Sequence, residues 1–149
     1  MRSSNSILSV VPVEELSVSK FVFDTVLLVS LLSFAPKMLG ALFAAMTVSF
    51  IDDLFHGKFR DVKPVTAKLI CALDALMGLT LTIGLVGDYS YVTGAGFALY
   101  ALAYGIRCVM SYKTSALLFT FHMIYAGLGA WISVTFFANQ LLLKIPSVL

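Results

Sequence analysis

The sequence predicts an all-α bundle of transmembrane helices, because it is rich in apolar residues, poor in charge and divided into long apolar runs. Of its 149 residues, 60% are hydrophobic and 12% are charged, and the mean hydropathy is +0.97. A soluble domain carries roughly 45–50% apolar and about 25% charged residues. Too few polar side chains remain to cover a water-facing surface, so we expect a polytopic integral membrane protein in a single domain.

Five apolar segments follow a polar tail that covers residues 1–15. The last three segments are close to the ~20 residues that cross a ~30 Å hydrocarbon core as a helix. Barrel strands are not expected, because the segments lack the alternation of apolar and polar residues that a lipid-facing strand requires. The expected helices cover about 16–34, 36–54, 66–86, 92–110 and 114–138.

The first apolar stretch admits two interpretations. A single helix over 21–51 would be ~46 Å long at about 1.5 Å per residue, and it would place Lys37 deep in hydrocarbon at a cost of ~2.5–3.5 kcal/mol. A tight hairpin instead starts a second helix at Pro36, whose missing N–H is harmless at a first helical position, and it brings Lys37 to the interface. We therefore expect five helices, with four as the alternative. The first helix should stay as a membrane anchor, because no suitable signal-peptide cleavage site follows it.

Positive charges set the expected orientation, because cytoplasmic loops are enriched in Lys and Arg. The polar loop at 55–65 and the helix start after it carry Lys58, Arg60, Lys63 and Lys68. The connector at 87–91 carries no cation. We expect the loop on the cytoplasmic side of the inner membrane and the connector outside. Five helices place the N-terminus inside, whereas four would place it outside. The cations could also bind anionic headgroups at about 1 kcal/mol each, although the topology signal alone explains them.

Small residues recur four positions apart, a spacing that lets membrane helices approach closely. The pairs are Ala41/Ala45, Ala101/Gly105 and Ala126/Ala130. We expect these pairs at helix contacts, and we expect aromatic side chains near the ends of the runs to anchor the helices at the interface. The expected anchors are Tyr89, Tyr91, Tyr104, Tyr112 and Trp131.

Asp74 is the residue least suited to its surroundings, because it lies in the apolar run KLICALDALMGLTL. An intramembrane carboxylate marks a functional or packing site with a partner. Asp74 and His122 each lie about eight residues, or ~12 Å, from the expected cytoplasmic ends of their helices, and Arg107 lies near the end of its own. We expect a cluster of these three residues, in which Asp74 either fixes helix register or relays protons. Asp24 is a weaker case, near a helix start and interfacial.

No cofactor, metal or catalytic centre is expected. His56 and His122 are the only histidines, and His56 lies in the polar loop, which does not favour a haem between them. The two cysteines form no metal-binding spacing. Phosphate-binding and nucleophile motifs are missing from the sequence, so we do not expect an enzyme. The net charge of +2 gives no reason to expect a nucleic-acid partner.

The stretch GALFAAMTVSFIDDLFHGKF, followed by AKLICALDALMGL and GLVGDYSYVTGAGFALYAL, resembles the small phage holins of the lambda type. The resemblance covers about residues 38–105, roughly half of the chain. It implies a Gly-Ala-led helix, a polar turn, a second helix with an Asp and a Cys, and a third helix that contains Gly. The chain departs from the family by one added helix on each side and by the apolar end LLLKIPSVL. No site residue of the family is carried over.

Three functions are therefore expected, each with the lipid bilayer as its setting. The first is holin-like permeabilisation through self-association of helices into a homo-oligomer. The second is a non-catalytic accessory subunit or assembly factor of a larger membrane complex, which the lack of a polar pore-lining stripe favours. The third is a small proton-coupled transporter that uses Asp74.

Overall fold

The computed structural model describes residues 18–57, 64–113 and 115–142, and all regular structure in these ranges is helical. The helices are α1 (Val18–Phe34), α2 (Pro36–His56), α3 (Pro64–Val86), α4 (Ser90–Ser111) and α5 (Ala116–Leu142). The expected all-α fold with five helices is therefore confirmed. The largest difference at a helix end is at α5, which runs past 138 to Leu142. Asn139 and Gln140 end the apolar run there, but neither residue breaks a helix.

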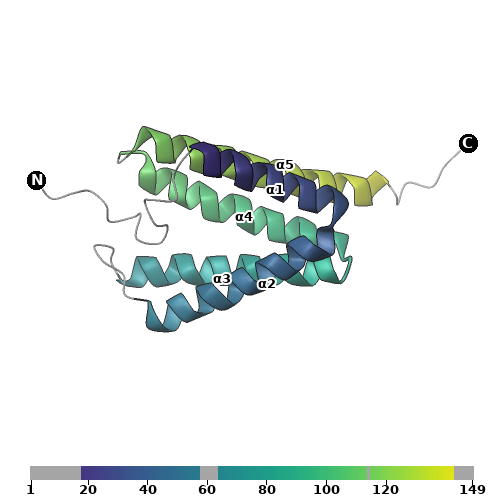
Figure 1. Ribbon diagram of the computed structural model, residues 1–149, viewed down its shortest axis with the longest axis horizontal. Helices are drawn as coiled ribbons and strands as arrows, with labels where there is room; N and C mark the ends of the chain where they lie inside the picture. Colours follow the sequence, from purple (N-terminus) through teal and green to yellow (C-terminus); the bar gives the residue numbers. More distant parts are fainter. Residues whose placement is uncertain (1–17, 58–63, 114, 143–149) are drawn as a thin grey trace, which may run out of the picture.

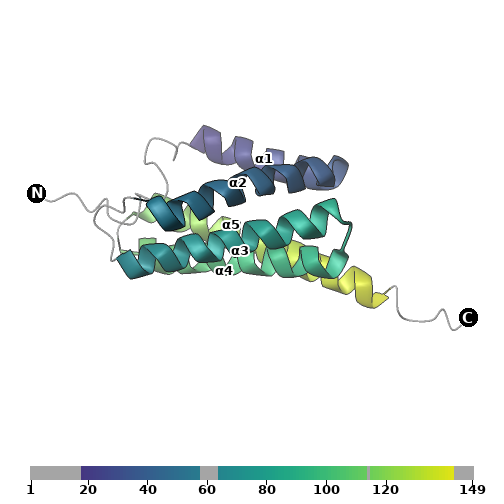
Figure 2. The ribbon, with the colours of Figure 1, turned by 90° about the horizontal axis from the view of Figure 1, so that it is seen from below.

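The first apolar stretch is a hairpin. The helix breaks at Ala35, whose backbone has φ −145° and ψ 60°, and Pro36 opens α2 at its first turn. The carbonyl of Ala35 accepts hydrogen bonds from the backbone N–H groups of Met38 and Leu39, so the new helix starts directly. The chain reverses direction at this turn (Figures 1 and 2). The single long helix is thereby excluded.

The helices form two layers (Figures 1 and 2). One layer holds α3, α4 and α5 as successive antiparallel neighbours, and α2 packs closely on α3. α1 lies over α5 and makes little contact with α2 beyond their shared turn. Phe21 of α1 stacks on Phe121 of α5, with ring centroids 4.4 Å apart. The bundle is therefore tightest along α2–α5 and loosest at α1.

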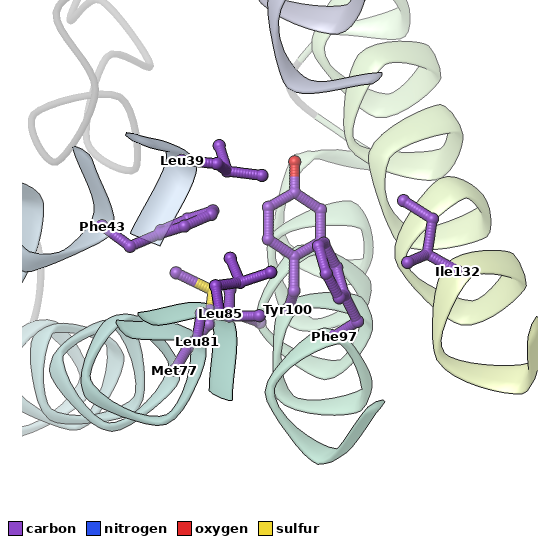
Figure 3. Packing of buried hydrophobic residues seen from close by; sticks show 9 residues of the cluster. Leu39, Phe43, Met77, Leu81, Leu85, Phe97, Tyr100 and Ile132 are labelled. Carbon is purple, nitrogen blue, oxygen red and sulfur yellow. The ribbon is translucent and has the colours of Figure 1, made fainter. Parts of the chain in front are cut away.

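The hydrophobic core lies where α2, α3, α4 and α5 meet (Figure 3). Phe97 of α4 and Leu81 of α3 are fully buried at its centre. The other core residues are Leu39, Phe43, Met77, Leu85, Tyr100, Ala103 and Ile132. α1 contributes only partly buried leucines to this core. Packing of α1 therefore buries less apolar surface than packing of the other helices does.

Four helices, α2–α5, are long and apolar enough to cross a membrane among the residues described. α1 has 17 residues, at the lower limit of the ~17–25 that a span requires. These are the features of a transmembrane helical protein. α2 ends, and α3 begins, at one end of the bundle, which we name the α2–α3 end (Figure 1). The opposite, α3–α4 end carries the turn at Ala35 and the connector between α3 and α4.

Lys37 lies at the α3–α4 end, not in the middle of a helix. Its ammonium group is 3.6 Å from the carboxylate of Asp88, and both side chains are mostly exposed. Asp88 has φ 56°, the left-handed conformation that a tight turn after a helix requires. The ion pair therefore joins the α1–α2 turn to the α3–α4 turn, and the hairpin spares Lys37 from hydrocarbon.

Candidate functional site

Asp74 of α3 and Arg107 of α4 form an ion pair inside the bundle. The Nη2 group of Arg107 donates a hydrogen bond to Oδ2 of Asp74. The exposed fraction is 1% for Asp74 and 8% for Arg107, so the pair is shielded from surrounding lipid. Asp74 lies ten residues, or ~15 Å, from the start of α3, and Arg107 lies only ~6 Å from the end of α4. The long arginine side chain spans the difference in depth instead of extending to water.

Tyr104 supports the arginine from the other side. The guanidinium carbon of Arg107 is 5.3 Å from the centroid of the Tyr104 ring, a cation–π distance. Tyr104 was expected to be an interfacial anchor, and that expectation was wrong. Its ring packs inside against Tyr100 and Tyr125, with centroids 4.6 and 5.0 Å away. Tyr104 lies one turn before Arg107 on α4, so both residues are on the inward face of this helix.

His122 of α5 lies beside this pair but does not bond to Asp74. Its Nδ1 is 3.1 Å from the hydroxyl oxygen of Ser111 on α4. Its ring centroid is 6.0 Å from that of Tyr104. The structure therefore brings Asp74 and Arg107 together as expected. It places His122 next to this pair, where His122 contacts Ser111 and not Asp74. Ser111 was not expected at the site, because a serine at the end of an apolar run gives no sequence signal.

The polar interior is fully satisfied within the residues described. Their buried side-chain nitrogen and oxygen atoms all have hydrogen-bond partners. Ser133 of α5, for example, donates to the carbonyl of Gly94 on α4 at 2.8 Å. A network of this kind fixes the register of α3, α4 and α5, because any shift would strand a polar group in an apolar interior. This geometry fits a register-fixing role for Asp74.

Asp24 lies near the start of α1, where the sequence predicted it, three residues after Phe21. It is only half-buried. Next to it, the hydroxyl of Thr25 interacts with that of Tyr125. The hairpin turn decides which face of α1 is inward, and that turn was one of two interpretations of the sequence.

The expected small-residue pairs mostly do not form contacts within one copy. Ala41, Ala45 and Ala130 are exposed, and a Cβ atom at Gly105 would meet nothing within 4 Å. Ala126 is half-buried. Ala101 alone is at a close helix contact, where its backbone nitrogen is 3.1 Å from a Cβ built on Gly129. The prediction that these pairs form contacts inside the bundle is therefore wrong for most of their residues. Ala and Gly occur on every face of an apolar helix, so spacing alone does not identify the packed face.

Glycines make the close helix approaches instead. Gly129 of α5 faces the backbone of α4, and a Cβ there would lie 2.6 Å from Tyr100. Gly96 of α4 faces Leu81 of α3, with 2.7 Å to the nearest side-chain atom. Gly94 faces Phe137 of α5. The Gly94-x-Gly96 pair therefore packs one residue on each neighbouring helix, and α4 is held closely on both sides.

The basic loop is mostly outside the described residues, including Lys58, Arg60 and Lys63. Lys68 is exposed on α3, in its second turn. The described ranges hold no group of three or more His, Cys, Asp or Glu side chains that could bind a metal. His56 pairs instead with Asp52 on the surface of α2, with Nδ1 and Oδ1 3.1 Å apart.

Known proteins give no assignment for this arrangement. No protein-family model matches the chain, and no curated protein and no solved structure resembles it significantly.

Proposed function

We propose that this protein acts by lateral association in the bilayer, as a holin-like permeabiliser of the inner membrane, and that it is not an enzyme. The observation that supports the proposal is the outward face of α2. This face consists of Ala41, Ala45, Ser49 and Asp52, which are all exposed in one copy. In this proposal the basic loop is cytoplasmic, as the positive charges indicate.

The α2 outward face holds small and polar residues, and the exposed side chains of Met38 and Val48 lie on the same side of the helix. Its residues follow one another at intervals of three or four positions, so they share one side of the helix. The opposite side, with Leu39 and Phe43, is buried against the core. Small and hydroxylated side chains let helix backbones approach closely. A second copy is therefore the partner that we propose.

The closed interior supports assembly over conduction by a single copy. Polar side chains buried in the described helices are paired with one another, as Arg107 is with Asp74 and Ser111 with His122. The described helices therefore bury no unpaired polar side-chain atom that could line a water path within one copy. Permeation in this proposal arises between copies.

The test is timed expression with a membrane-potential dye and a co-expressed endolysin. We expect the potential to collapse at a reproducible time and the endolysin to be released. Ala45→Leu should delay or abolish collapse, because the added atoms prevent close approach at the α2 outward face. Sustained expression of the unchanged protein with an intact potential would overturn the proposal.

Ala130→Leu is the matched control, because Ala130 is an exposed alanine on α5. Both substitutions add the same atoms at a surface position, where effects on the free energy of unfolding are about ±0.5 kcal/mol. We expect Ala130→Leu to leave the timing unchanged. Loss of activity with Ala130→Leu and not with Ala45→Leu would move the contact to α5 and refute the face assigned here.

A second candidate is a non-catalytic accessory subunit that uses the same α2 face against a different protein. The many exposed large apolar side chains on the described helices favour it, because they leave little polar surface to line a pore between copies. Chemical cross-linking in native membranes separates the two. Products of two or more identical chains support self-association, and a single heterologous partner lost in Ala45→Leu supports the accessory subunit.

A further inference from the structure

We draw no further inference here: the strongest candidate, the polar side-chain cluster in which His122 of α5 and Ser111 of α4 lie beside the Asp74–Arg107 pair, belongs to the site already described and, within the described residues, leaves no buried side-chain nitrogen or oxygen without a hydrogen-bond partner.

Discussion

Asp74 and Asp24 are both inward-facing carboxylates in apolar helices, yet their surroundings differ. Asp74 is 1% exposed and bonded to a buried arginine in the tightly packed part of the bundle. Asp24 is half-buried on the helix that packs most loosely. The comparison teaches that the role of an intramembrane carboxylate is set by the helix opposite it. A carboxylate bonded to a buried arginine fixes the register of two helices, whereas a half-buried carboxylate on a loosely packed helix constrains the bundle less.

The largest effect of removing a charge should follow from breaking the Asp74–Arg107 pair. Asp74→Ala should reduce the free energy of unfolding by ~3–5 kcal/mol, because a charged arginine is left buried without its partner. Asp74→Asn should cost less, because the amide oxygen can still accept a hydrogen bond from Arg107. SDS titration of the protein in mixed micelles, followed by circular dichroism, measures both changes.

Asp24→Ala is the matching variant at the loose helix, and it should change the free energy of unfolding much less than Asp74→Ala. Equal losses would break the comparison between the two carboxylates. The double variant Asp74→Leu/Arg107→Leu sharpens it further, because exchanging a whole buried pair for apolar residues is often neutral or stabilising.

Aromatic truncation compares the same two regions without involving charge. Phe97→Ala should reduce the free energy of unfolding by ~3–5 kcal/mol, the range for a large core side chain, because Phe97 is fully buried. Phe21→Ala should cost clearly less, because Phe21 is half-buried and contacts mainly one helix. The same SDS titration measures both. A larger loss for Phe21→Ala would show that α1 is as tightly held as the core helices.

Glycine substitutions should have intermediate effects. Gly129→Ala should cost ~1–3 kcal/mol through overpacking, because the new Cβ would lie 2.6 Å from the Tyr100 ring and 3.1 Å from the Ala101 backbone nitrogen. Gly105→Ala is the control, with open space around the new atom, and should stabilise its helix by ~0.5–1 kcal/mol. This packing would be contradicted if unfolding titrations showed both variants to be more stable, or both to be less stable, than the unchanged protein.

The sequence predicted the features that follow from the position of a residue along its helix. It did not predict which face of each helix points inward. Pro36 and Lys37 together predicted the hairpin, because one residue favours a helix start and the other avoids hydrocarbon. Depth along the helices predicted that Asp74 and Arg107 could meet. The alanine pairs did not identify the packed faces, since small residues occur all around these helices. The inward position of Asp24 follows from how α1 lies on α5, which no pattern within α1 encodes.

The smallest effect should come from the Lys37–Asp88 pair, although it is the ion pair that joins the hairpin turn to the α3–α4 turn. Its charged atoms are 3.6 Å apart, with about two thirds of each side chain exposed. Water and salt screen such a pair, so its coupling energy should be ~0–1 kcal/mol. A double-mutant cycle with Lys37→Ala and Asp88→Ala measures it, and the value should fall as salt is raised. A coupling well above 1 kcal/mol that does not respond to salt would mean that the α1–α2 turn is clamped to the core helices. α1 would then be held firmly at both its turn and its aromatic contacts, and the contrast between a tight core and a loose first helix would no longer hold.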